Sequence, residues 1–223
     1  MNINSQDLIL SLVSLTPVVL LVLLGQFLWS HKILKGEYSR KFVHMLSATW
    51  IATWRFFLPA GYVIGMALAM GIGVYIFKKL KLFKSLYSVK RLTYGEVSYA
   101  VAIAVTAFFF KQPEVYFLAI INLGIGDGLA AIVGRKYGKK KKPSRVFGIK
   151  SFAGSSACFL FVLTTGALFW TLADLAPNVN YDIGALYVFL AAFIIASAEL
   201  FADKGIDNLI IPIVTGLIFG GIV

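Results

Sequence analysis

Apolar residues occur in long runs along this chain, and short polar segments separate the runs. A helix that spans a bilayer needs about 20 mostly apolar residues. Eight runs approach that length: 8–30, 42–58, 60–77, 95–110, 115–134, 152–174, 184–202 and 208–223. The second and third are separated only by the stretch LPAG, which favours a tight hairpin. The pattern predicts an all-α, polytopic integral membrane protein with about eight transmembrane helices.

Composition agrees with this interpretation. Of the 223 residues, 59% are hydrophobic and only 14% are charged, whereas about a quarter of the residues in a soluble domain are charged. The first run lacks the basic region and the small-residue cleavage site of a secretory signal, so we expect it to remain a membrane helix. We predict a single transmembrane domain over residues 1–223.

Positive charge is distributed unevenly between the predicted loops. All but two of the 21 lysines and arginines follow the first, third, fifth or seventh predicted helix, and the opposite side keeps Arg55 and Lys111. Cytoplasmic loops are enriched in Lys and Arg. We therefore place the lysine-rich side in the cytoplasm and both termini on the non-cytoplasmic side, and we expect no nucleic-acid partner.

Four ionisable residues fall inside or at the edge of predicted helices. Such residues are costly in a bilayer, so each is a functional hypothesis. On the predicted topology all of them lie in the cytoplasmic half, near the lysines: His44, Glu96, Asp127 and Glu199. The acids assigned to the outer side lie in loops or at the N-terminus.

Asp127 begins a stripe of small residues at helical spacing, with Ala131, Gly134 and Gly138. The stripe leads from the acid toward the cytoplasm and the run Lys139–Lys142. Small residues also favour a close contact between two helices. Packing needs no charge, however, so the carboxylate favours a functional site.

Three other segments carry candidate chemistry. In GIKSFAGSSA, Lys150 and Ser151 stand where a helix begins, and a helix N-terminus with a lysine and hydroxyls binds phosphate well; an ordinary capped helix is the alternative. In SRKFVHM, residues 40, 41 and 44 share one helical face, which suits an anionic group and a base. Membrane anchoring and helix packing remain the alternatives there.

The segment ELFADKGIDNLIIPI offers carboxylates for a metal ion. Glu199 and Asp203 share a helical face, Gly205 breaks the helix, and Asp207 with Asn208 starts the next one. Mg²⁺ is usually bound by one or two carboxylates together with phosphate oxygens. A polar turn that only caps two helices is the alternative. Together, the segments indicate phosphoryl or nucleotidyl transfer to a lipid, chemistry that rests on positioning and charge neutralisation.

The pieces RKFVH, GDGLAAIVGRKYGK, KSFAGS and ELFADKGIDNLIIP occur in this order over residues 40–212. They resemble the membrane-bound family of dolichol kinases, phytol kinases and CTP-dependent diacylglycerol kinases. The resemblance implies transfer of the γ-phosphate of CTP to a lipid hydroxyl, with a divalent metal, at the cytoplasmic face. One departure is Ala153, which stands where the family usually has Glu and which affects the expected nucleotide geometry.

Motifs and resemblance together give the predicted site. Catalytic candidates are Asp127, His44 and Glu199, and metal ligands for Mg²⁺ are Asp127, Glu199 and Asp207. The candidates for binding CTP are Arg40, Lys41, Gly134, Gly138, Lys139, Lys140, Lys150, Ser151, Gly154 and Asn208. The acceptor would be a long-chain isoprenoid or related lipid alcohol, whose tail enters between helices from the surrounding membrane lipids.

Two other functions stay open from the sequence. Phosphatidate cytidylyltransferases share the core pattern, but they carry a further C-terminal signature with His-Gly-Gly, which is absent from this chain. A transporter of an anionic substrate would also place acids in its helices and lysines at its mouth, and the GIGDG stretch suits a broken transporter helix. Transporters place their sites near the midplane, whereas these groups fall in one half.

Overall fold

The structure is a computed structural model that describes residues 4–80, 82–83, 95–138, 150–174, 184–202 and 205–221. Within those ranges the chain forms helices and turns and no strand, which confirms the predicted all-α class. Two short elements accompany the α-helices, a 3₁₀-helix (Trp54–Phe56) and a π-helical turn (Asn122–Gly126). The α-helices are α1 (Ser5–Ser30), α2 (Glu37–Ala52), α3 (Ala60–Lys79), α5 (Gly95–Phe109), α6 (Pro113–Ile121), α7 (Asp127–Tyr137), α8 (Phe152–Asp174), α9 (Ala185–Phe201) and α10 (Asp207–Gly220).

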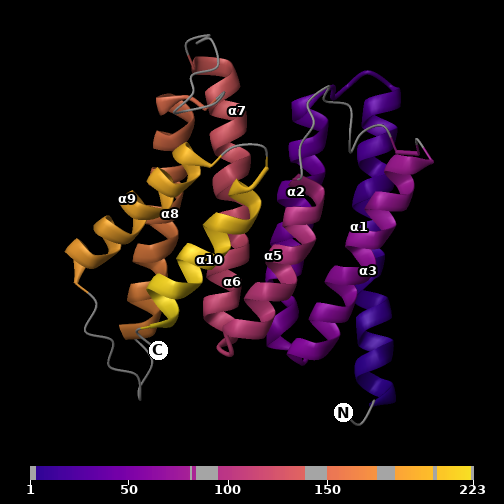
Figure 1. Ribbon diagram of the computed structural model, residues 1–223, viewed down its shortest axis with the longest axis horizontal. Helices are drawn as coiled ribbons and strands as arrows, with labels where there is room; N and C mark the ends of the chain where they lie inside the picture. The colour runs from indigo at the N-terminus through magenta and orange to yellow at the C-terminus, as the bar shows by residue number, and fades with distance from the viewer. Residues whose placement is uncertain are drawn as a thin grey trace.

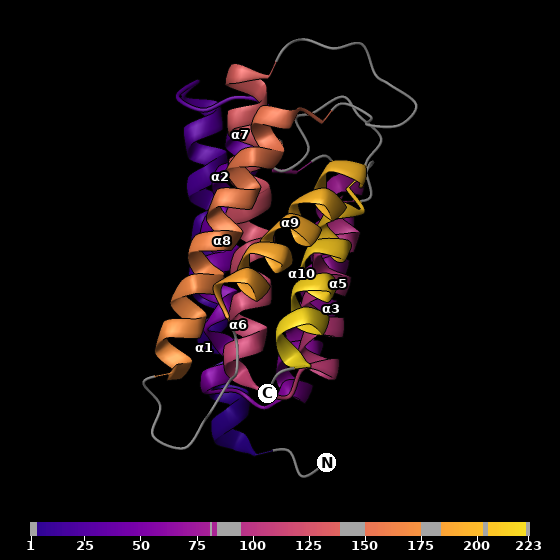
Figure 2. The same ribbon diagram turned by 90° about the vertical axis from the view of Figure 1, so that its left-hand side faces the viewer.

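The helices form one bundle in which successive passes run in alternating directions (Figure 1). α6 and α7 occupy the middle, with α1, α2, α3 and α5 on one side and α8, α9 and α10 on the other. The start of α1 and the end of α10 lie at the same end of the bundle (Figures 1 and 2). Arg55 and Lys111 also lie together, since Arg55 Nη2 donates to the Lys111 carbonyl. This arrangement agrees with the predicted alternation, while the orientation in a membrane stays a prediction.

Among the described residues, four segments are long and apolar enough to cross a membrane: Ser5–Ser30, Ala60–Lys79, Pro113–Tyr137 and Phe152–Leu172. Three further apolar helices are shorter, namely α5, α9 and α10. These seven segments and α2 correspond in order to the eight predicted runs. The chain is therefore a membrane protein, and the number of eight passes stays a prediction.

Helix α2 begins earlier than its hydropathy indicates. The apolar run starts at residue 42, but the helix starts at Glu37 because the polar turn before the run is also helical. Glu37 pairs with Arg40 at the i, i+3 spacing that brings two side chains together on a helix. The extra turn places charged side chains from α2 inside the bundle.

α6, the π-helical turn and α7 form one continuous central segment. In the most apolar window of this segment 61% of the residues are buried, against at most 28% in the other three long segments. Asn122, in the π turn, is fully buried and its Oδ1 accepts a hydrogen bond of 2.8 Å from Thr165 Oγ1. A π turn inserts one residue into an α-helix, which rotates all later side chains by about 100°. It immediately precedes Asp127.

Glycines let α7 approach the start of α8 closely. A Cβ built on Gly134 would lie 2.8 Å from Ser151 Oγ, and one built on Gly154 would collide with the Ala130 carbonyl oxygen. Ser151 caps α8, since its Oγ accepts a hydrogen bond of 3.2 Å from the Gly154 N–H. The small-residue stripe of α7 is thus a helix–helix contact in this structure.

We predict that Gly154→Ala destabilises the protein by about 1–3 kcal/mol, because the added methyl meets backbone that cannot rotate away. Gly73→Ala in α3 is the matched control. Its Cβ meets open space, so it should be neutral or stabilising by up to about 1 kcal/mol. Thermal unfolding of the purified protein in detergent measures both. Equal melting temperatures for the two variants would contradict the close contact of α7 with α8.

Candidate active site

Three carboxylates from separate helices meet inside the bundle. Asp127 is the first residue of α7, Glu199 lies near the end of α9, and Asp207 is the first residue of α10. One oxygen from each lies within 4.8 Å of the others, and all three residues are buried. Gly205 allows this meeting because its φ of 88° lets the chain reverse between α9 and α10. The predicted trio of metal ligands is therefore brought together.

Two lysines lie within this carboxylate cluster. Lys41 Nζ, from α2, donates to Asp127 Oδ2. Lys150 Nζ donates to Glu199 Oε1 and, at 2.6 Å, to Asp207 Oδ2. Burial alone would lower the pKa of Lys150, but the carboxylates of Asp207 and Glu199 outweigh burial and hold that pKa above its usual value. Lys150 therefore stays charged. We call these five residues the charged cluster.

The charged cluster carries an excess of negative charge. It contains three carboxylates and two ammonium groups, which leaves one formal negative charge among the residues that the structure describes. Two nearby acids have partners of their own. Glu37 pairs with Arg40, and Glu96 lies 3.6 Å from Lys78 Nζ. A buried charge without a counter-charge costs several kcal/mol. The arrangement therefore favours a cation at these carboxylates.

Histidine 44 stands at the edge of the charged cluster. Its Nε2 lies 3.5 Å from Asp127 Oδ2, and its ring contacts the backbone of Leu123 in the π turn. Nε2 is buried and has no hydrogen-bond partner within the described ranges. The other side of the imidazole packs on the Tyr99 ring, with 4.7 Å between centroids. His44 therefore lies between the carboxylates and a space that α2 lines together with α1, α3 and α5.

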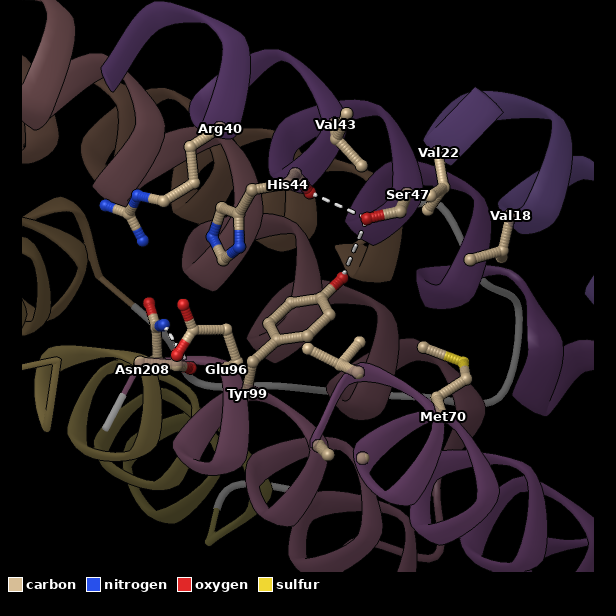
Figure 3. Close-up of a pocket in the computed structure, with 14 residues that line it drawn as sticks. Val18, Val22, Arg40, Val43, His44, Ser47, Met70, Glu96, Tyr99 and Asn208 are labelled. Atoms are coloured by element: carbon tan, nitrogen blue, oxygen red, sulfur yellow. Dashed lines mark hydrogen bonds between the residues drawn. The ribbon is translucent and has the colours of Figure 1, made fainter. Parts of the chain in front are cut away.

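That space is a cavity of about 100 Å³ between α1, α2, α3, α5 and the start of α10. Figure 3 shows polar side chains at one end, where Arg40, Glu96 and Asn208 lie beside His44. The other end is apolar. Ser47 and Tyr99 lie between the two ends, with their hydroxyl oxygens 3.3 Å apart (Figure 3). The cavity thus passes from a charged end at the carboxylates to a hydrocarbon interior.

Asn208 joins the polar end of the cavity to α5. Its Nδ2 donates to the Gly95 carbonyl at 2.8 Å, whereas its Oδ1 is buried and unpartnered in the described part of the chain. Space is limited at Gly95, where a Cβ would come within 3.3 Å of Asn208 Nδ2 and 3.7 Å of Arg40 Nη1. An acceptor oxygen and a guanidinium therefore face one small volume beside His44.

The predicted site residues that the structure describes separate into three groups. Asp127, Glu199, Asp207, Lys41 and Lys150 form the charged cluster, and His44, Arg40 and Asn208 line the cavity next to it. Gly134, Gly138, Ser151 and Gly154 lie where α7 meets α8, so their predicted role toward a nucleotide stays a prediction. Lys139, Lys140 and Asp203 lie outside the described residues.

Several contributors were not predicted. Ser155 Oγ donates to Glu199 Oε2 at 2.6 Å, and Ser155 stands one helical turn after Ser151, a spacing that could have indicated it. Glu37 could have been found as an acid three residues before Arg40. No sequence signal marked Ser47 or Tyr99, because a serine and a tyrosine within apolar runs are ordinary in membrane helices.

The charge count makes a prediction about stability. Lys41→Met leaves a second unpaired negative charge among the buried carboxylates, so we expect it to destabilise the protein by about 3–5 kcal/mol. Adding Asp127→Asn to that variant restores the original charge and should recover most of the loss. Thermal unfolding in detergent without divalent cations measures the difference. A Lys41→Met variant as stable as the parent chain would contradict the ion pair.

Comparison with known proteins gives a consistent group of relatives. The chain is 30% identical over 191 residues to a phytol kinase of Synechocystis sp., which covers 82% of this chain and 78% of the relative. It is 28% identical over 214 residues to phytol kinase 1 of Arabidopsis thaliana, covering 87% and 69% of the two chains. A farnesol kinase of the same plant is 29% identical to this chain over 166 residues. The aligned residues cover 72% of this chain and 53% of the farnesol kinase. No protein-family model and no solved structure matches. From the extent of its similarity to the cyanobacterial enzyme, the chain belongs to the polyprenol and phytol kinase family.

Proposed function

We propose that this protein is a membrane-bound kinase that transfers a phosphoryl group from a nucleoside triphosphate to the hydroxyl of an isoprenoid alcohol. The observation that carries the proposal is the charged cluster, with its excess negative charge. It lies directly beside a cavity that is polar at the end near the cluster and apolar at the other end. Phosphoryl transfer needs cations around a polyphosphate and a hydroxyl held in line. The relatives are named as kinases of phytol and farnesol, which favours this reaction over cytidylyl transfer or transport.

The carboxylates suit Mg²⁺ as the cation. Mg²⁺ prefers oxygen ligands and commonly uses one or two carboxylates together with phosphate oxygens and water. Asp127, Glu199 and Asp207 supply such oxygens within 4.8 Å of one another. A bound Mg²⁺ would neutralise the charge that develops on the phosphates. Lys150 and Ser155 would then keep Glu199 oriented by their hydrogen bonds.

We propose CTP as the donor, on the strength of the family resemblance. Its triphosphate would approach the carboxylates from the side of α8. There Lys150 supplies positive charge, and the first turn of the helix supplies N–H groups that favour an anion. Lys139 and Lys140 precede this helix in the chain and would add positive charge. Ala153, at the position where the family usually has Glu, lies in the same first turn.

The acceptor hydroxyl would reach the charged cluster from the cavity side. His44 lies between the two, with its unpartnered Nε2 3.5 Å from Asp127 Oδ2. An imidazole or a carboxylate at hydrogen-bond reach of a hydroxyl can accept its proton during transfer. We propose that His44 or Asp127 does so, while Arg40 holds an anionic oxygen at the polar end.

Replacing the acid tests the proposed reaction. We predict that Asp127→Asn abolishes phosphoryl transfer, because it removes a proposed metal ligand. The fold should remain intact, because the substitution also balances the two ammonium groups of the charged cluster with two carboxylates. Purified protein with radiolabelled CTP, Mg²⁺ and farnesol measures the transfer, and thermal unfolding checks the fold. Full activity of the folded variant would overturn the assignment. Parallel reactions with ATP, GTP and UTP test the donor.

Metal binding can be measured without turnover. Paramagnetic Mn²⁺ can stand in for Mg²⁺, and we expect Asp207→Asn to weaken its binding by about 10- to 100-fold, the range found for changes around metal sites. Glu114→Gln is the control, because Glu114 is an exposed acid at the opposite end of the bundle. The free Mn²⁺ signal in electron paramagnetic resonance gives both affinities. Equal affinities for Asp207→Asn and Glu114→Gln would exclude the carboxylates as the metal site.

A further inference from the structure

We infer that the cavity beside His44 is the binding pocket for the first isoprene units of the acceptor, and that its walls set which alcohols are accepted. The inference rests on the proposed function, which it extends by assigning the lipid a place. Three features support it: the direction of the cavity, the order of its polarity, and its width.

The direction comes from the spacing of the lining residues. On α2 they recur from Arg40 through His44 to Ser47, and on α1 they include Val18 and Val22. Residues at three- and four-residue spacing lie along one face of a helix. The seven steps from Arg40 to Ser47, at about 1.5 Å each, span about 10 Å. The cavity is therefore elongated along the helices, as an extended hydrocarbon chain requires.

The order of polarity fits an alcohol. Among the lining residues the charged groups, Arg40 and Glu96, gather at the end next to the charged cluster. In the middle, Ser47 Oγ donates to the His44 carbonyl at 3.2 Å and lies 3.3 Å from the Tyr99 hydroxyl. The two hydroxyls are hydrogen-bonded within the protein, so a hydrocarbon chain can lie beside them without leaving a polar group unpaired. An amphiphile would lie with its hydroxyl at His44 and its chain toward α1.

The width favours a single chain. On one wall α3 and α5 are so close at Gly71 that a Cβ there would lie 2.9 Å from Ala100 Cβ. On the opposite walls β-branched residues of α1 and α2 face inward, among them Val22 and Val43 (Figure 3). A slot of about 100 Å³ between such walls accommodates one narrow chain. We therefore expect the two acyl chains of a diacylglycerol to be accepted less well than one isoprenoid chain.

Two valines of α1 provide a matched test. Val22 lines the cavity, whereas Val19, nearly one turn away, is 55% exposed on the outer surface. We expect Val22→Phe to lower kcat/KM for farnesol about tenfold or more, because filling a hydrophobic pocket excludes chains that need the space. Prenol, with one isoprene unit, should be affected much less. Val19→Phe should leave both values unchanged. Met70→Phe enters the same cavity from α3 and should repeat the effect if Val22→Phe does not fold.

A photoreactive farnesol with a diazirine at its tail gives a second readout that needs no turnover. In the parent chain we expect crosslinks to peptides of α1 and α3, competed by farnesol and weakened by Val22→Phe. If the parent phosphorylates farnesol but Val22→Phe and Val19→Phe behave alike in both measurements, the pocket assignment is overturned and the kinase proposal stands. Crosslinking at α1 and α3 without any phosphorylation would support the pocket and overturn the kinase. If the parent chain shows neither crosslinking at α1 and α3 nor phosphorylation of farnesol, the pocket assignment and the kinase proposal are both overturned.

Discussion

The burial of three carboxylates in an apolar bundle is the constraint on which the rest of this structure depends. Charge inside a membrane protein is tolerated only where it is paired or faces water. Lys41 and Lys150 reach the carboxylates from α2 and from the start of α8, so the cluster connects helices that are far apart in the sequence. Lys150 connects the start of α8 to both α9 and α10, because its two acids are Glu199 and Asp207. Function and fold therefore share one set of ion pairs.

The lysines have two roles that compete. In this structure they compensate acids that would otherwise be exposed to a low dielectric, where charge interactions are strong. In the proposed reaction a metal would bind at these carboxylates, and Lys41 would then face the phosphates of the donor, while Lys150 would keep its hydrogen bond to Glu199. The pairing of Lys41 with Asp127 can thus be understood as a resting arrangement, in which the protein supplies its own counter-ions.

Much of this could be read from the sequence. Eight apolar runs correspond in order to eight helical segments, because hydropathy follows from the solvent around each helix. The trio Asp127, Glu199 and Asp207 was predicted as a group, since charged residues in apolar runs are rare and therefore informative. The pairing of each acid with its lysine was not, because helical spacing defines a face and not a partner. Nor was the cavity: its walls are ordinary apolar residues, and only packing shows that they leave space. The early start of α2 was missed because hydropathy does not record a polar turn of helix.

The π turn at Asn122–Gly126 has a consequence for how such proteins diverge. Because it adds one residue to the central helix, loss of a single residue there would leave a regular, equally apolar membrane helix. That helix would still insert, and its hydropathy profile would look unchanged. Yet Asp127 would turn by about 100°, away from Lys41 and the two other acids. The number of residues in this turn thus determines the direction of Asp127, which the identity of the residues alone does not show. A relative with every motif intact but one residue fewer here would lose the meeting of its acids, and the glycine stripe of its α7 would turn away from α8 at the same time.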